Sequence, residues 1–239
     1  MDTLKLEKGS TLMVAHRGLS GIEKENTMPA FVAAGNRSFF GIETDVHRTA
    51  DGQFVVIHDD STKRVAGVDF IIEETDFDTL RKIQLIDRDG TENRTDLKIP
   101  TLREYIKTCK RYEKKSVLEL KNEFSFEDVE RVVDIIKEEG YIENVIFISF
   151  CFENLVRIRK ILPGHDVQFL FEEYTSETIQ KVKEHGFDID ILYTSLNKER
   201  IDECHSLGIK VNCWICDDLN AAKEFVEYGI DYITTDIIE

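Results

Sequence analysis

Two carboxylates placed two residues apart give the first sign of chemistry in this sequence. Glu43 and Asp45 lie in the run GIETDV, which is typical of a β-strand. Because side chains two apart on a strand point to the same face, both carboxylates would share one side of a sheet. Burying them there unpaired is costly, and a divalent cation would offset the cost. The alternative is that they face solvent or form ion pairs with Arg17 and Lys121.

A third carboxylate and two cations could join this site. Glu119 and Lys121 lie two apart in the run LELK, so they would also share a face. Three carboxylates supply only oxygen ligands, which favour Mg²⁺ or Ca²⁺ over zinc. Lys121 would place a positive charge beside the ion, and Arg17 offers a planar fork that suits two phosphate oxygens.

Two histidines follow apolar runs and are candidates for proton transfer. His16 follows the run LMVA, and His58 follows Phe54–Ile57. A metal ion, an arginine and a lysine beside two histidines could stabilise charge on a phosphoryl group while protons move. The alternative for either histidine alone is a structural role. His47 is interpreted as a loop or supporting residue because HRTADGQ reads as a turn, and we assign no function to His165, His185 or His205.

The elements that must position these residues alternate between strands and helices. Such alternation indicates parallel strands joined by helices. Eight strands are predicted, the number in a (β/α)8 barrel, in which functional groups project from the carboxyl ends of the strands. They are Leu12–Ala15, Gly41–Val46, Ser116–Leu120, Val145–Ser149, Val167–Phe171, Ile189–Tyr193, Lys210–Cys213 and Tyr232–Thr234.

The helices between the strands follow a three- and four-residue apolar period. They are predicted near Glu127–Glu139, Phe152–Ile161, Ser176–His185, Lys198–Leu207 and Leu219–Tyr228. Two regions break the alternation. Residues from His58 to Pro100 form an excursion after the second strand, and too few residues follow the eighth strand for an eighth helix. We therefore expect one α/β domain over residues 1–239, with an insertion at about 60–100.

Composition narrows the class of partner. The chain has 239 residues, with 31 Lys and Arg against 47 Asp and Glu, so its overall field argues against nucleic acid or an anionic membrane surface as a partner. No apolar run has the ~20 residues of a spanning helix, and five irregularly spaced cysteines suit a reducing compartment. We therefore expect a cytoplasmic protein without stable membrane insertion, compatible with a homo-oligomer. Cys213 and Cys216 are expected to point to opposite faces of a strand rather than to form a redox or zinc site.

These residues together resemble the glycerophosphodiester phosphodiesterase family. AHRGLSGIEKENTMPAF is similar to the opening signature of the family, in which His-Arg-Gly is followed by Glu-Asn-Thr. GIETDVHRTADGQFVVIHDD resembles the second signature. IPTLREYI, LELK, the Ser149-Phe150 pair, the Trp214 strand and GIDYITTD resemble later family segments. The resemblance therefore spans nearly the whole chain.

The resemblance implies a (β/α)8 TIM barrel with a small insertion that often shapes the glycerol pocket. It implies that His16 and His58 are general acid and base, in an order the sequence leaves open. It implies that Glu43, Asp45 and Glu119 hold Mg²⁺ or Ca²⁺. Arg17 and Lys121 would hold the phosphate, and Phe150 and Trp214 would line the substrate site unless they are ordinary barrel packing.

The implied reaction converts a small glycerophosphodiester to sn-glycerol 3-phosphate and an alcohol, with a glycerol hydroxyl as internal nucleophile. The sequence departs from the family in the curtailed last helix after Asp236 and in charged Glu23 and Lys24, which would alter the pocket rim. Two alternatives stay open. A phospholipase D-like or lysophospholipase D-like enzyme would need an exposed apolar rim, which the sequence does not predict. A non-catalytic barrel binding a phosphorylated ligand would be expected to lack one of the reactive residues.

Overall fold

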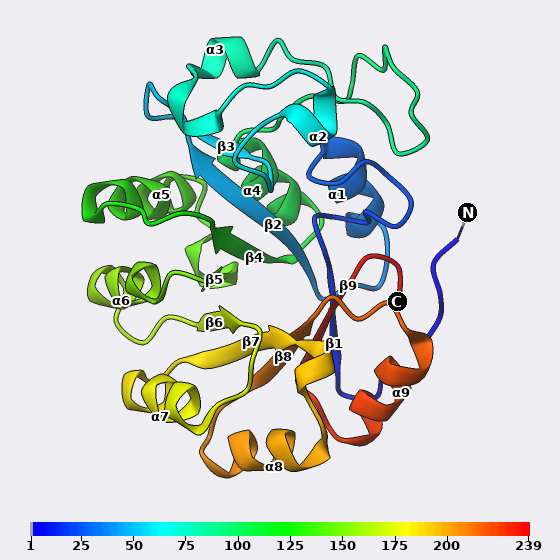
Figure 1. Cartoon of the computed structure of the whole chain (residues 1–239), viewed down its shortest axis with the longest axis vertical. Coiled ribbons are helices and arrows are strands. Elements are labelled where there is room, and N and C mark those ends of the chain that lie inside the picture. The colour runs from blue at the N-terminus through cyan, green and yellow to red at the C-terminus, as the bar shows by residue number, and fades with distance from the viewer. Residues whose placement is uncertain (1) are drawn as a thin grey trace.

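The computed structural model describes residues 2–239 and contains a closed barrel of eight parallel strands (Figure 1). Pairing of β1 with both β2 and β9 closes the ring. The predicted (β/α)8 fold is confirmed, and each predicted strand boundary lies within two residues of the observed one. The barrel strands are β1 (Leu12–Ala15), β2 (Gly41–Arg48), β4 (Lys115–Leu120), β5 (Val145–Ser149), β6 (Val167–Phe171), β7 (Asp188–Leu192), β8 (Val211–Trp214) and β9 (Tyr232–Thr235).

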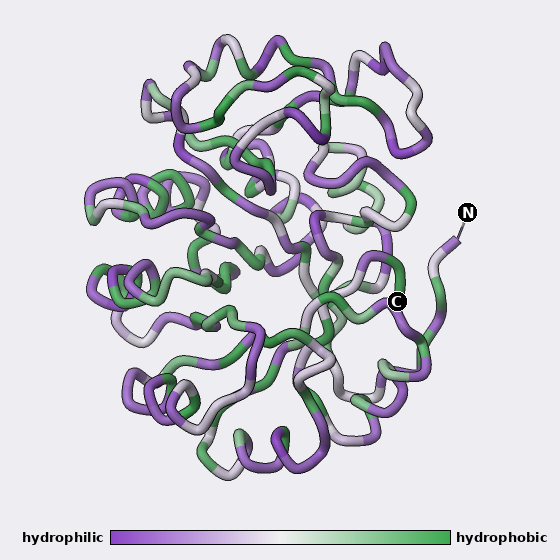
Figure 2. The backbone as a smooth tube through the Cα atoms, in the orientation of Figure 1, coloured by the Kyte–Doolittle hydropathy of each residue, from purple (hydrophilic) through white to green (hydrophobic). Residues whose placement is uncertain are grey.

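Helices on the outside of the barrel connect consecutive strands. Their apolar side chains pack on the strands. Figure 2 shows hydrophilic residues mainly on the outer side of these helices. The N-terminus of α4 illustrates how the sequence sets a boundary. Thr101 accepts a hydrogen bond from the backbone of Glu104, whose side chain accepts one from the Thr101 backbone. The connecting helices are α1 (Met28–Gly35), α4 (Leu102–Arg111), α5 (Phe126–Glu138), α6 (Phe152–Ile161), α7 (Ser176–His185), α8 (Lys198–Ser206) and α9 (Leu219–Glu227), with single turns η2 (Ile142–Asn144) and η3 (Tyr193–Ser195).

The two ends of the chain meet where an eighth helix would lie. Among residues 2–239, no helix follows β9 and none precedes β1. The extended N-terminal segment instead pairs with the C-terminal one through Leu4 and Ile238. The buried Glu239 carboxylate accepts hydrogen bonds from Thr3 and Lys5. The end of the barrel is thus sealed by paired termini.

The excursion after β2 begins with a strand that the sequence did not predict. β3 (Phe54–Val56) runs antiparallel to the extended end of β2. It is followed by α2 (Lys63–Ala66), η1 (Ile72–Glu74) and α3 (Phe77–Leu80), which form the cap at the top of Figure 1. A separate group of buried side chains supports this insertion: Val55, Ile57, Val65, Ile72, Leu80, Leu85, Leu97 and Ile99.

Side chains inside the barrel form their own layer. Val14, Val117, Ile146 and Leu170 fill its interior, while the alternate side chains of the strands face the helices. Cys213 and Cys216 are both buried in the core. The expectation that they point to opposite faces is wrong, because β8 ends at Trp214 and strand alternation does not extend to Cys216. The two thiols lie against each other, and burial raises the pKa of Cys213.

The structure also bears on the expectations about membrane-spanning helices and exposed apolar segments. None of the helices between residues 2 and 239 combines the length and apolar character that crossing a bilayer requires. The expectation that no apolar segment is exposed is wrong for the insertion, where Val68, Phe70 and Ile71 are 46%, 39% and 44% exposed.

Candidate active site

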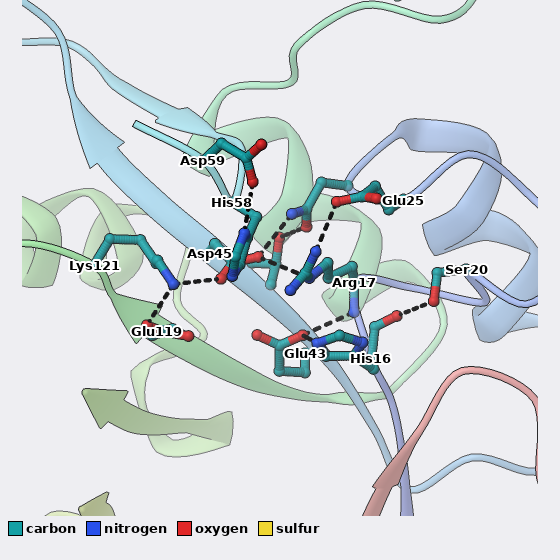
Figure 3. A network of polar contacts seen from close by, with 12 residues as sticks. His16, Arg17, Ser20, Glu25, Glu43, Asp45, His58, Asp59, Glu119 and Lys121 are labelled. Carbon is teal, nitrogen blue, oxygen red and sulfur yellow. Dashed lines mark hydrogen bonds and ion pairs between the residues drawn. The ribbon is translucent and has the colours of Figure 1, made fainter. Parts of the chain in front are cut away.

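Three carboxylates meet inside the barrel near its carboxyl-terminal mouth. Glu43 and Asp45 lie on β2, and Glu119 lies on β4 directly beside Asp45 in the sheet. All three are buried, and one oxygen of each lies within 4.8 Å of the others. The shared face predicted from the spacing of two is therefore the barrel interior, and Figure 3 shows the three side chains pointing toward one another.

Repulsion between these groups is incompletely balanced by protein cations. Burial and the neighbouring carboxylates of Asp45 and Glu119 raise the pKa of Glu43 well above its usual range. Burial and Asp45 likewise raise the pKa of Glu119 to about 8. Burial opposes ionisation of Asp45 too, but Lys121 and Arg17 hold its pKa below the usual range. Carboxylates that disfavour one another's charge in this way fit a hard divalent cation.

The two cations contact the carboxylate cluster from opposite sides. Lys121 Nζ lies 2.9 Å from Glu119 Oε1 and 3.4 Å from Asp45 Oδ1. Arg17 Nε lies 3.6 Å from Asp45 Oδ2, and its Nη1 donates to Glu25 Oε1 at 2.8 Å. The ion pairs considered as the alternative to metal binding are therefore present. They coexist with the carboxylate cluster. Asp45 Oδ1, which Lys121 approaches to 3.4 Å, accepts no hydrogen bond from residues 2–239.

The turn between β1 and α1 requires particular residue types and places two hydrogen-bond donors beside the carboxylate cluster. Arg17 has a positive φ of 51°, and its backbone N–H donates to Glu43 Oε2 at 2.7 Å. Gly18 is required next, because a Cβ there would lie 2.7 Å from the Ala30 backbone. Asn26 also has a positive φ, of 53°, and donates to Asp45 Oδ2 at 2.7 Å. The backbone N–H of Arg17 and the side-chain amide of Asn26 therefore hold the carboxylate cluster from this side.

Both candidate histidines have a carboxylate on Nδ1, which leaves Nε2 available. His16 Nδ1 lies 2.7 Å from Asp236 Oδ1, and His58 Nδ1 lies 2.8 Å from Asp59 Oδ1. A carboxylate at this nitrogen fixes the orientation and the tautomer of the ring. Burial lowers the pKa of His58. The role of Asp236 was missed in the sequence, although its place directly after the last strand was visible.

His47 is not a loop residue. It lies on the extended end of β2, opposite Val55 of β3, and is fully buried. Its Nε2 lies 3.2 Å from the backbone oxygen of His58, and its Nδ1 lies 3.5 Å from Glu73 Oε1. The prediction of a loop was wrong because β3 extends the strand, but the supporting position near His58 is what the structure shows.

A cavity of about 70 Å³ connects most of these groups. His16, Arg17, Glu43, His58 and Glu119 line it together with Ile148 and Leu170. The two predicted aromatic residues, Phe150 and Trp214, form part of its wall and meet edge to face at 5.5 Å. Asp45 and Lys121 do not line this cavity and lie behind it, in contact with residues that do.

Asp190 is a polar residue of this cavity that the sequence interpretation did not select. It lies on β7 beside Leu170, is 1% exposed, and its Oδ1 accepts no hydrogen bond from the described part of the chain. Burial and the neighbouring Glu119 raise its pKa well above the usual range. An unpartnered buried carboxyl group facing a cavity is a candidate for ligand contact.

Fold and site together define the class of this protein as a (β/α)8-barrel enzyme. Its acidic, cationic and histidine groups meet at the carboxyl ends of the strands, where enzymes of this fold carry their active sites. The chain belongs to the glycerophosphoryl diester phosphodiesterase family, whose model matches residues 16–239. This membership confirms the resemblance seen in the sequence and the prediction of a phosphodiesterase.

Known relatives cover nearly the same length. The glycerophosphodiester phosphodiesterase of Caldanaerobacter subterraneus subsp. tengcongensis is 28% identical over 95% of this chain and 94% of its own. The crystal structure of a glycerophosphodiester phosphodiesterase from Parabacteroides distasonis superposes with a TM-score of 0.81 at 28% identity, covering 96% of this chain and 94% of that one. A phosphodiesterase of Oleispira antarctica in complex with the product sn-glycerol-3-phosphate has the same fold, with a TM-score of 0.83 at 22% identity, covering 97% of this chain and 95% of that one.

Proposed function

We propose that this protein is a metal-dependent phosphodiesterase that hydrolyses small glycerophosphodiesters to sn-glycerol 3-phosphate and an alcohol. The observation that carries the proposal is the single cavity lined by two histidines, an arginine and two carboxylates of a buried cluster. Membership of the family and the product held by the relative from Oleispira antarctica support the same substrate class.

The carboxylates of Glu43, Asp45 and Glu119 would hold Mg²⁺ or Ca²⁺. When bound, the ion supplies positive charge that neutralises the phosphate oxygens. Arg17, which lines the cavity, and Lys121, which pairs with Glu119 behind the cavity, are proposed to bind and orient the phosphate. The site therefore positions an anion inside a protein whose net charge is −16.

His58 is proposed as the first general base and His16 as the general acid. Burial lowers the pKa of His58, so its ring is neutral near pH 7 and can accept the proton of the attacking glycerol hydroxyl. That hydroxyl forms a bond to phosphorus while the bond from phosphorus to the alcohol oxygen breaks. His16 then donates a proton to the departing oxygen. Water opens the resulting cyclic glycerol phosphate, with the two histidines in exchanged roles.

The glycerol part is proposed to lie in the cavity beside Phe150 and Trp214. This cavity places His58 next to the carboxylate cluster, so the attacking hydroxyl is proposed to lie there. The aromatic wall suits the carbon face of glycerol, and the carboxyl group of Asp190 would hydrogen-bond its terminal hydroxyl. Residues 60–100 of the insertion, expected to shape the glycerol pocket, contribute none of the residues that line this cavity.

The first test is release of sn-glycerol 3-phosphate from glycerophosphocholine and glycerophosphoethanolamine by the purified protein. The assay is run with EDTA and then with Mg²⁺ or Ca²⁺ restored. Release that depends on the metal is expected. Release that EDTA leaves unchanged would contradict the metal site, and no release with any metal would contradict the activity itself.

The lipid alternative has one observation in its favour. The exposed Val68, Phe70 and Ile71 lie on the insertion and could contact an acyl chain. These side chains line neither of the two pockets that contain His16. A lysophospholipid offered in the same assay decides between the readings, because a soluble-substrate enzyme should hydrolyse it more slowly than its deacylated counterpart. The non-catalytic alternative predicted loss of a reactive residue, and every proposed one is present.

A further inference from the structure

A second pocket adjoins the catalytic cavity and shares His16 and Arg17 with it. Its volume is about 200 Å³, and its remaining lining residues are Ser20, Lys24, Glu25, Arg88 and Asp236. Neither His58 nor Glu119 lines it. If the glycerol hydroxyl attacks from the first cavity, the alcohol on the far side of phosphorus must leave toward this second pocket. His16, which faces both, stands where a proton is needed by the departing oxygen.

Every carboxylate that lines the second pocket already has a partner. Glu25 accepts hydrogen bonds from Arg17 and from both terminal nitrogens of Arg64, at 2.7–2.8 Å. Asp236 is bound by His16 at 2.7 Å and by Ser20 at 2.8 Å. Arg17 and Arg64 hold the pKa of Glu25 at about 2, against the effect of burial. The negative charge of this pocket is therefore compensated within the protein.

Neither of the two remaining cations of the pocket contacts a carboxylate among residues 2–239. Lys24 is only 8% exposed, yet its ammonium group forms no hydrogen bond or ion pair with residues 2–239. Burial lowers the pKa of Lys24 against the opposing charges of Glu25, Asp87 and Asp59, none of which it contacts directly. Arg88, from the insertion, donates to the backbone oxygen of Gly21 and has no carboxylate partner. An ammonium group that lines a pocket without a carboxylate in contact is the complement of an anionic ligand.

We propose that the second pocket binds the leaving alcohol and that Lys24 selects alcohols carrying an anionic group, a carboxylate or a second phosphate. The inference rests on the proposed diesterase activity and narrows its substrate class. Lys24 acts as a specificity residue, and the insertion contributes through Arg88 to the leaving-group side.

Two matched substrate pairs test the proposal. Glycerophosphoserine differs from glycerophosphoethanolamine by one carboxylate. The diester of glycerol phosphate with glycerol 3-phosphate differs from glycerophosphoglycerol by one phosphate. The quantity measured is kcat/KM for the ester with the additional anionic group divided by kcat/KM for its partner. This ratio cancels any general loss of activity. In Lys24→Met the ratio should fall about tenfold for at least one pair, as expected from loss of one charge-assisted hydrogen bond.

Lys24→Arg should retain most of the preference, and Lys183→Met, on the exposed end of α7, should leave both ratios unchanged. The pair that responds identifies whether the anionic group is a carboxylate or a phosphate. Equal ratios in wild type and Lys24→Met for both pairs would overturn the inference while leaving the diesterase proposal intact. Failure of the wild type to cleave any of the four esters would contradict the diesterase proposal instead.

Discussion

Replacing Asp190 with leucine is expected to stabilise the protein and to weaken its activity. Asp190 is 1% exposed, and its Oδ1 accepts no hydrogen bond from residues 2–239. A buried unsatisfied polar group costs about 1–3 kcal/mol. Leucine removes that cost and matches the neighbouring Leu170 across the sheet. Since 1 kcal/mol shifts Tm by about 2–4 °C in a protein of this size, we expect Tm to rise by at least ~2 °C.

The gain in stability should depend on pH. Burial, together with the charge of Glu119, raises the pKa of Asp190 well above its usual range. The folded state therefore retains a proton that the unfolded state releases above about pH 4. The stability associated with this proton is fully present below that pH and is lost as pH rises through the folded-state pKa. In EDTA, the Tm difference between Asp190→Leu and wild type should thus be larger at pH 8 than at pH 4.

Activity should change in the opposite direction, through the glycerol part of the substrate. Loss of one hydrogen bond to the terminal hydroxyl should lower kcat/KM for glycerophosphoethanolamine about 3- to 10-fold. An analogue with propane-1,2-diol in place of glycerol keeps the attacking hydroxyl but lacks the terminal one. Wild type should prefer glycerol, and Asp190→Leu should not. A destabilised variant, or one that keeps the glycerol preference, would refute the reasoning that this carboxyl group is retained for binding.

Three further predictions follow from the site. His58→Ala should lower kcat about 10²-fold or more while the affinity for Mg²⁺ or Ca²⁺ is retained; near-normal turnover would remove His58 from the mechanism. The acid limb of the wild-type kcat/KM profile should lie below pH 6.5, because burial lowers the pKa of His58. Added Mg²⁺ or Ca²⁺ should raise the wild-type Tm, and Glu43→Gln should need more metal for the same shift, whereas Glu177→Gln on α7 should behave as wild type; identical titrations would exclude Glu43 as a ligand. His47→Phe keeps the buried volume but loses the contact with the His58 backbone, so kcat should fall about tenfold with little change in KM; an unchanged kcat would show that β3 alone positions His58.

The barrel was predictable because its strands are short apolar runs whose period survives in the sequence. Glu43 and Asp45 were found from the same strand pattern, since two acidic residues two positions apart in a predicted strand share one face. The turn HRTADGQ gave no such signal. Its residues are mostly polar, although His47 among them is buried. The strand conformation of His47 is stabilised by pairing with β3 rather than by its neighbours in sequence. The elements of the insertion could not be predicted for a similar reason. Its core side chains are irregularly spaced in the sequence and meet only in the folded chain.

Asp190 and Lys24 differ in how far sequence reasoning could have reached them. The run FDIDIL contains two acids, Asp188 and Asp190, placed two residues apart, so the argument that selected Glu43 and Asp45 applies equally to Asp190. Lys24 has no comparable pattern, because a charged residue in a loop normally faces solvent. Its burial arises from the turn between His16 and α1 and from Arg88 of the insertion, two segments more than sixty residues apart that enclose one pocket. Family signatures therefore suffice to propose the groups that act on phosphorus, while the proposed choice of leaving alcohol depends on a pocket that only the three-dimensional structure brings together.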